Sequence, residues 1–313
     1  MKIFQIIDKV NTYGYNSGKG RETMKQSHLI RAISVDGSAF IHAADTTAMV
    51  AKACEVHPLS KTMTAVLGRA LTATALMSAQ LKGKDNSLTL QLQGDGPAGT
   101  IVCVGDSMGN VKGYAANPET ELPPNDQGKL DVGGAVGSGM LHVIRDLGMN
   151  EPYHGMIPLV TGEIAEDITE YYAQSEQIPS ACALGVRVNR DLSVKSAGGF
   201  LVQLLPGADP EVITALEENL KNIGSVSQKI AEGVTPLQLI EMVFANIPFD
   251  ILDQNDVAYT CSCSREKYSR ILSTLNQKDL QSLIDENEPI ETVCNFCNSK
   301  YVFQVDELKQ YLK

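Results

Sequence analysis

Cys261-Ser-Cys263 and Cys294-Asn-Phe-Cys297 place four of the seven cysteines of this 313-residue chain near its carboxyl end. Two close thiol pairs that a short fold brings together supply the four sulfur atoms of a closed tetrahedral zinc site. Each pair is also short enough to form a disulfide without the other. A site with both chemistries indicates a redox switch, so this stretch decides the fold of the carboxyl-terminal segment and the functional interpretation.

The composition is that of a soluble globular protein, with 43% hydrophobic and 20% charged residues. The net charge of -11 argues against coating nucleic acid or an anionic membrane surface. Met1–Lys9 reaches Asp8 before a signal-peptide apolar run develops, and Ala65–Leu81 is too short for a membrane span. We therefore expect a cytoplasmic protein, where clustered cysteines more often bind metal or carry out redox chemistry than form permanent disulfides.

The first two thirds of the chain mix strand and helix patterns. Predicted strands are Leu29–Val35, Leu88–Gln93, Thr100–Val104, Val111–Ala115, Ala183–Val188 and Phe200–Leu205. Predicted helices are Thr46–Val56, Leu59–Leu81 and Glu163–Gln174. Because several strands follow one another with only turns between them, we expect an α+β core with a mainly antiparallel sheet over residues 1–208.

The pattern becomes helical after Leu205-Pro-Gly-Ala208. An apolar stripe at helical spacing predicts a helical linker at 209–250 that must lean on the core: Val212, Leu216, Leu220, Ile223 and Ile230. Residues 251–313 are predicted to form a small zinc-binding domain, with helices at Arg265–Leu275 and Lys278–Asp285 and a final helical turn at Asp306–Leu312. Val293–Phe303 is predicted to be a hairpin that carries Cys294 and Cys297 at its turn.

Several other patterns carry no function. Gly94-Asp-Gly-Pro-Ala-Gly99 matches the dinucleotide fingerprint, but a strand follows it where the mechanism needs a helix, and Gly14–Gly20 lacks the Ser or Thr of a phosphate loop. The five histidines form no pair with metal spacing: His28, His42, His57, His142 and His154. The isolated cysteines are expected to be small buried hydrophobic residues: Cys54, Cys103 and Cys182. No active site is evident, and the chain is predicted not to be an enzyme.

Three alternatives compete with a sensor at the cysteine cluster, besides a purely structural zinc knuckle. A zinc-ribbon nucleic-acid binder is disfavoured because residues 254–313 carry seven Lys or Arg against nine Asp or Glu. A thiol–disulfide oxidoreductase that uses Cys294 and Cys297 would leave the other pair without a role. A catalytic zinc site is disfavoured because four thiolates leave no open coordination position.

Longer stretches give the chain a resemblance to a known family. They are Gly113-Tyr114 with Asn117-Pro118, Gly128-Lys-Leu-Asp131, Gly162-Glu-Ile-Ala-Glu-Asp167, Ser175-Glu-Gln-Ile-Pro-Ser180, Gly198-Gly-Phe200 and Gln203-Leu-Leu-Pro-Gly-Ala208. Together with the two cysteine pairs, the chain resembles the heat shock protein 33 family of bacterial redox-regulated holdase chaperones over essentially its whole length. It departs slightly at Asn298, where glycine is frequent, and in a somewhat long gap between the pairs.

The resemblance implies one zinc ion per chain, held by Cys261, Cys263, Cys294 and Cys297 in a reduced, inactive form. It implies that oxidative stress, especially with heat, forms disulfides that link Cys261 to Cys263 and Cys294 to Cys297, with loss of zinc. The carboxyl-terminal domain and linker would then unfold, and the oxidised chains would form a homodimer. This dimer would hold unfolding client proteins without ATP and later pass them to the ATP-driven heat-shock 70 machinery.

Overall fold

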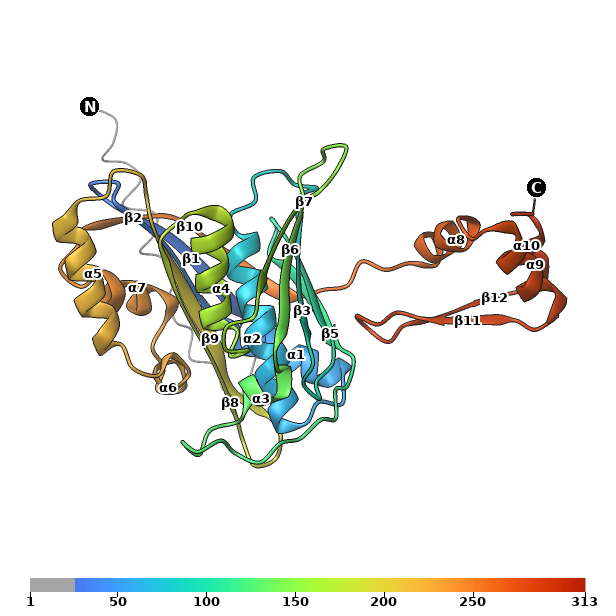
Figure 1. Ribbon diagram of the computed structural model, residues 1–313, viewed down its shortest axis with the longest axis horizontal. Helices are drawn as coiled ribbons and strands as arrows, with labels where there is room; N and C mark the ends of the chain where they lie inside the picture. Colours follow the sequence, from blue (N-terminus) through green and yellow to red (C-terminus); the bar gives the residue numbers. More distant parts are fainter. Residues whose placement is uncertain (1–25, 313) are drawn as a thin grey trace, which may run out of the picture.

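The computed structural model describes residues 26–312, and both Met1–Lys9 and the Gly14–Gly20 loop lie outside this range (Figure 1). The strands are β1 (Ser27–Ser34), β2 (Ala39–Asp45), β3 (Ser87–Gly94), β4 (Ile101–Asp106), β5 (Asn110–Ala115), β6 (Gly139–Asp146), β7 (Tyr153–Pro158), β8 (Ser180–Val188), β9 (Val194–Leu204), β10 (Phe249–Tyr259), β11 (Ile290–Val293) and β12 (Lys300–Phe303). The helices are α1 (Thr47–Val56), α2 (Lys61–Ser78), α3 (Val132–Val136), α4 (Ala165–Tyr171), the π-helical turn η2 (Tyr172–Glu176), α5 (Pro210–Asn222), α6 (Val226–Ala231), α7 (Pro236–Phe244), α8 (Arg265–Ser273), α9 (Gln277–Asp285) and α10 (Val305–Lys309).

The core is a ten-stranded sheet with the strand order β7-β6-β3-β4-β5-β10-β1-β2-β9-β8. Its neighbouring strands are antiparallel except at one place, where β10 pairs with β5 in parallel through Ala258–Asn110 and Tyr259–Val111. Each predicted strand and helix of the core is present, and the mainly antiparallel α+β fold is confirmed. The sequence patterns missed β2, β6, β7 and β10.

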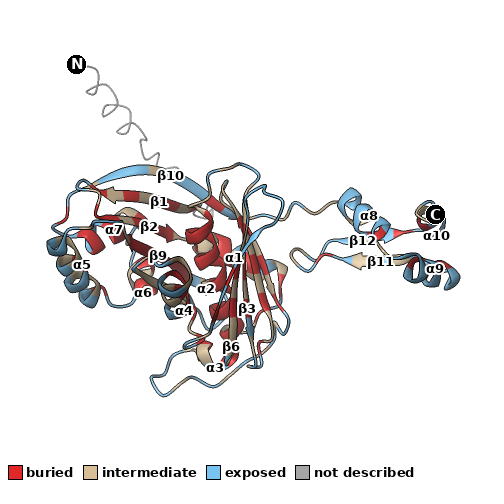
Figure 2. Cartoon of the chain, turned by 45° about the horizontal axis from the view of Figure 1, so that its top comes forward, coloured by how far each residue is buried: buried red, intermediate tan, exposed pale blue. Residues whose placement is uncertain are grey.

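Helix α2 forms the centre of the core (Figure 2). Every residue of α2 except Lys61 and Arg69 is buried, and its first turn is capped by Ser60, whose side chain accepts from the Met63 amide at 3.0 Å. The buried hydroxyl of Thr72 donates to the Gly68 carbonyl at 2.8 Å, which satisfies a polar group inside the core. The expectation of a buried helix at this position is confirmed. Across residues 26–312, the structure contains no helix with the length and apolar content that a membrane crossing requires.

The glycines of the Gly94–Gly99 turn serve close packing. A Cβ atom on Gly94 would lie 1.9 Å from the Val136 carbonyl oxygen, and one on Gly96 would lie 2.4 Å from that of Ala135. The turn joins β3 to β4 and packs against the backbone of α3, so no helix follows it. Its glycines are required because only a residue without a side chain fits there.

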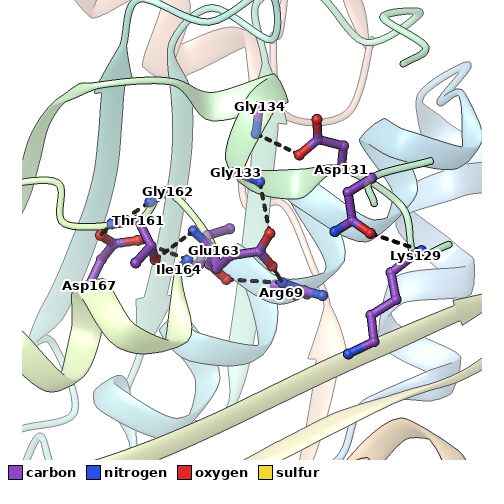
Figure 3. A network of polar contacts seen from close by, with 11 residues as sticks. Arg69, Lys129, Asp131, Gly133, Gly134, Thr161, Gly162, Glu163, Ile164 and Asp167 are labelled. Carbon is purple, nitrogen blue, oxygen red and sulfur yellow. Dashed lines mark hydrogen bonds and ion pairs between the residues drawn. The ribbon is translucent and has the colours of Figure 1, made fainter. Parts of the chain in front are cut away.

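The Gly162–Asp167 stretch ties three parts of the core together (Figure 3). The buried Asp167 carboxylate accepts hydrogen bonds from the amides of Val160 at 2.7 Å and Ile164 at 2.9 Å, which order the turn before α4. The side chain of Glu163 pairs with Arg69 of α2 and accepts from the Gly133 amide of α3 at 3.1 Å. This stretch is therefore a structural joint between α2, α3 and α4.

The linker helices α5, α6 and α7 cover one face of β1, β2 and β9, as the apolar stripe predicts. Asp209 caps α5, and Gly224 and Gly233 follow α5 and α6 with φ values of 67° and 96°. The helices bury residues of their stripe against the sheet in one cluster: Leu216, Ile223, Val226, Ile230, Leu239, Ile240, Val243 and Phe244 against Ile30, Ala32, Ile41, Ala43, Phe200 and Val202. This apolar interface is separate from the core around α2.

Strand β10 crosses the predicted boundary between residues 250 and 251. It pairs antiparallel with β1, from Ser27–Val257 to Ser34–Phe249, so residues 251–259 belong to the core sheet. The division into domains at 1–208, 209–250 and 251–313 stays a prediction, with this strand as the element that straddles it. Residues 260–312 are called the metal module below; they contain α8, α9, α10 and the β11–β12 hairpin.

Candidate metal centre

The four predicted ligands come from two segments of the metal module. Cys261 and Cys263 lie between β10 and α8, whereas Cys294 and Cys297 lie in the turn between β11 and β12. The amides of Cys297 and Asn298 donate to the Cys294 carbonyl at 3.2 and 2.8 Å and close this turn. Asn298 has a φ of 56°, the left-handed conformation that asparagine tolerates. The predicted hairpin with cysteines at its turn is thus present.

The fold brings the four sulfur atoms together, all within 4.8 Å of one another. The Sγ atoms of Cys261 and Cys294 are 3.8 Å apart, and those of Cys263 and Cys297 are 3.2 Å apart. In a tetrahedral zinc site with Zn–S bonds of about 2.3 Å, neighbouring sulfurs are about 3.8 Å apart. The cluster can therefore hold a metal ion, and its all-sulfur donor set and dimensions fit zinc.

The thiols differ in acidity without metal. Burial is the main cause that raises the pKa of Cys261 to about 12. Burial alone would also raise the pKa of Cys297, but hydrogen bonding with the side chain and amide of Ser299 lowers it to about 7, and the Ser299 Oγ is 3.2 Å from the sulfur. Because a metal binds the thiolate form, its binding must displace the proton of Cys261 in particular.

Two tyrosines, Tyr301 and Tyr268, pack next to the sulfur atoms. The Tyr301 hydroxyl lies 3.1 Å from Cys263 Sγ, and the Tyr301 ring lies against Tyr268 of α8 with 5.0 Å between centroids. Partners of this kind outside the ligand shell orient the ligands and tune a metal site. Tyr301 of β12 and Tyr268 of α8 therefore join the two halves of the centre, and no spacing in the sequence pointed to them.

The metal module has only a small apolar core of its own. Its buried members are Leu272, Leu280, Ile284, Phe303 and Leu308, from α8, α9, β12 and α10. This cluster is far smaller than the cluster around α2. Small domains with little buried apolar surface usually need a metal or disulfides to stay folded. The apolar core of the module is therefore of the size at which a small domain commonly relies on a metal or disulfides.

Phe296, between Cys294 and Cys297, docks the turn onto the core. Figure 1 shows the turn between β11 and β12 directed toward the sheet that contains β5. Its ring meets the edge of Tyr114 on β5, with 5.2 Å between centroids and an interplanar angle of 77°. The Lys112 ammonium lies 4.8 Å from the Phe296 centroid, within the range of a cation–π contact. The metal-binding turn is thus in direct contact with the sheet.

Polar contacts fix the same junction. The Tyr259 hydroxyl, at the end of β10, lies 2.5 Å from the Phe296 carbonyl oxygen and 2.8 Å from that of Gly113. His57 Nε2 lies 2.9 Å from the same hydroxyl. In addition, the Asn298 side chain donates to the Val56 carbonyl at 2.7 Å. These bonds link the turn to α1, β5 and β10 together.

The three isolated cysteines lie in the core, away from this cluster. Cys103 is buried, and Cys54 and Cys182 are half-buried, which raises the pKa of each thiol. A raised pKa keeps a thiol protonated and unreactive. The expectation of small apolar residues without chemistry agrees with their positions.

The position of Cys294 and Cys297 also bears on the oxidoreductase alternative. That chemistry places its first cysteine at the amino end of a helix, whereas these two lie in a hairpin turn and share their site with the other pair. The arrangement therefore fits four thiols that could hold one metal ion better than a two-thiol redox pair.

The chain is similar to proteins of one family over most of its length. The family model described as Hsp33 protein matches residues 27–304. A protein named 33 kDa chaperonin from Agathobacter rectalis is 48% identical over 283 residues, covering 90% of this chain and 98% of that protein. One of the same name from Acetivibrio thermocellus is 47% identical over 288 residues, covering 92% and 97%.

A solved structure shows the same fold. The crystal structure of a 33 kDa chaperonin, a heat shock protein 33 homolog from Thermotoga maritima, superimposes with a TM-score of 0.84 at 38% identity, covering 92% of this chain and 98% of that chain. The matched family is one of chaperones and not of enzymes. With its α+β core and its four-cysteine cluster, the chain belongs to the Hsp33 family.

Proposed function

We propose that this protein is a redox-regulated, ATP-independent holdase whose cysteine cluster is the switch. The observation that carries the proposal is the meeting of four thiols in a module with a small apolar core. Cys261, Cys263, Cys294 and Cys297 would hold one zinc ion per chain in the reduced state. Bound zinc keeps the four sulfurs as thiolates, the form that reacts with oxidants.

The oxidation is a two-electron reaction within each pair. A thiolate of one pair attacks hydrogen peroxide, and the O–O bond breaks to give a sulfenic acid and hydroxide. The thiolate of the second cysteine of that pair then displaces hydroxide from the sulfenic acid and forms the disulfide. The two hydroxides released take up two protons from the solvent, so each peroxide is reduced to two waters. We assign the disulfides to Cys261 with Cys263 and to Cys294 with Cys297, because each sulfenic acid has its partner two or three residues away.

The free energies favour unfolding of the oxidised module. A structural zinc site contributes on the order of 10–16 kcal/mol to the folding of small metal-dependent domains. Two disulfides that close such short loops restrict the unfolded chain by only about 1–2 kcal/mol each. The difference exceeds the net stability of a small domain, which is roughly 0.1 kcal/mol per residue. Oxidation should therefore unfold the metal module.

Unfolding of the module would remove the contacts of Phe296 and Asn298 with the core and free the carboxyl end of β10. The adjoining linker helices would then separate from β1, β2 and β9 and expose the apolar cluster between them. Exposed apolar surface of this extent binds other apolar chains. We propose unfolded proteins as clients, a homodimer as the oxidised form, hand-over to the ATP-driven heat-shock 70 system, and the cytoplasm as the location.

The test compares reduced, zinc-loaded protein with protein treated with peroxide at elevated temperature. Light scattering of a heat-denatured client enzyme should be suppressed only by the oxidised form. A colorimetric zinc indicator should report about one zinc released per chain, and circular dichroism should show loss of helix. Equal protection by both forms would exclude the switch.

A matched control separates the cluster from the other thiols. Cys54→Ser changes a half-buried core cysteine and should leave zinc content and activation unchanged. Cys294→Ser removes a buried ligand and should lower zinc retention. If Cys294→Ser kept its zinc and its oxidative activation, the proposed ligand set would be wrong.

A further inference from the structure

His142 of β6 and His154 of β7 lie side by side on the face of the sheet that points away from α2. In the β6–β7 register, His154 is opposite Ile144, two residues from His142 on the same face. The alternate residues Leu141, Val143 and Ile157 are buried in the core, so the histidines face outward. The sequence spacing gave no metal pattern for this pair, because only strand pairing brings the two rings together.

The two imidazoles have the geometry of ligands to a single ion. His142 Nδ1 and His154 Nε2 are 3.0 Å apart, and the rings stack with 5.2 Å between centroids and 27° between planes. Two nitrogens that bind one metal ion at about 2.1 Å lie roughly 3.0–3.4 Å apart for bond angles between 90° and 109°. Both histidines lie on regular strands, which keep the two rings positioned before an ion binds.

Partial burial and the neighbouring His154 lower the pKa of His142, which favours the neutral form of that ring. Neutral imidazole is the form that binds metal. His154 is exposed, which leaves one side of the pair open to solvent for an incoming ion and its waters. The pair takes no part in the cysteine cluster, which lies in the metal module.

The geometry points to a second metal site at His142 and His154, for a transition-metal ion that prefers imidazole, such as Ni²⁺, Cu²⁺ or Zn²⁺. Two protein nitrogens would bind the ion, and water molecules would fill its remaining coordination positions. With only two protein ligands the ion should dissociate more readily than from a site of four thiolates. Such an ion bridges β6 to the edge strand β7.

The experiment uses untagged, reduced, full-length protein whose cysteine cluster is saturated with zinc. Calorimetric titration with Ni²⁺ should show one further site per chain. Paramagnetic broadening of amide signals in ¹⁵N-correlated spectra should centre on β6 and β7. Because loss of even an outer-shell partner lowers metal affinity about 10–100-fold, His142→Gln or His154→Gln should weaken Ni²⁺ binding at least tenfold.

His28→Gln is the matched control, because His28 is a half-buried histidine that pairs with Asp256 elsewhere on the sheet at 2.8 Å. It should leave the Ni²⁺ affinity unchanged. Far-ultraviolet circular dichroism checks that each variant is folded. Wild-type affinity in the doubly substituted protein, broadening centred away from β6 and β7, or no Ni²⁺ binding at millimolar concentration would each show that the two rings form a hydrogen bond only and overturn the site.

Discussion

Replacing Phe296 by alanine should loosen the metal-binding turn from the core without removing a ligand. The ring contributes an edge-to-face pair with Tyr114 and a cation–π contact with Lys112. Aromatic pairs contribute about 0.5–1.5 kcal/mol beyond their buried area, and a cation–π contact near the surface about 0.5–1 kcal/mol. The docked state should therefore lose about 1–2.5 kcal/mol, which is about a 5- to 70-fold larger undocked population.

Hydrogen exchange of zinc-loaded, reduced protein measures this population directly. In Phe296→Ala, amides at residues 295–298 and on β5 should exchange faster, while α8, α9 and α10 keep their protection because the metal still holds the module. Removal of zinc by a chelator should also be faster in this variant.

Val302→Ala is the matched control, since Val302 lies on the same hairpin and is 45% exposed. It should leave exchange at the turn and on β5 unchanged. Tyr114→Ala, alone and combined with Phe296→Ala, completes a double-mutant cycle, which should return a coupling energy of about 0.5–1.5 kcal/mol, the contribution of the aromatic pair alone. Unchanged exchange at both the turn and β5 in Phe296→Ala would refute the docking argument.

Three further predictions concern single positions. Cys263→Ser should weaken zinc retention and lower the thermal stability of the metal module, measured by zinc content and circular dichroism, while the core melts as before; full zinc retention would remove Cys263 from the site. Burial lowers the pKa of His42 to about 3 and leaves both ring nitrogens unpartnered. The unfolded chain therefore binds one more proton than the folded chain between pH 6.5 and 3. The free energy of unfolding decreases as the pH is lowered through that window, and the loss reaches about 2 kcal/mol at pH 5. In urea denaturation His42→Leu should reduce this loss, and an unchanged pH dependence would contradict the prediction. Asp167→Asn should cost about 2–4 kcal/mol by weakening the charge-assisted hydrogen bonds to Val160 and Ile164, seen as a lower melting temperature of the core, and a wild-type melting temperature would contradict this role.

The four-cysteine cluster could be predicted from the sequence because it depends on residue type and spacing alone. CxC and CxxC are local patterns, and the hairpin that carries Cys294 and Cys297 follows from alternation and a turn. The linker stripe was equally readable, since one helical face is buried against the sheet. These features combine local pattern with a simple burial rule.

Features that depend on strand pairing were not readable. Strand β10 carries Asp250, Asp253 and Asp256 on a largely exposed surface, so it lacks the alternation that marks a half-buried strand. The contact of Phe296 with Tyr114 joins residues far apart in the chain, and the contact of His142 with His154 depends on register. No single-sequence pattern encodes such pairings.

The exposed strand β10 has a mechanical consequence for the molecule (Figure 2). Strand β10 connects the two halves of the sheet, β1-β2-β9-β8 and β5-β4-β3-β6-β7. It pairs with the second half through two residue pairs only. Thr260 alone separates its last residue from the first sulfur ligand. Because a single residue can absorb little movement, a displacement of the sulfur atoms would act directly on the short pairing between β10 and β5.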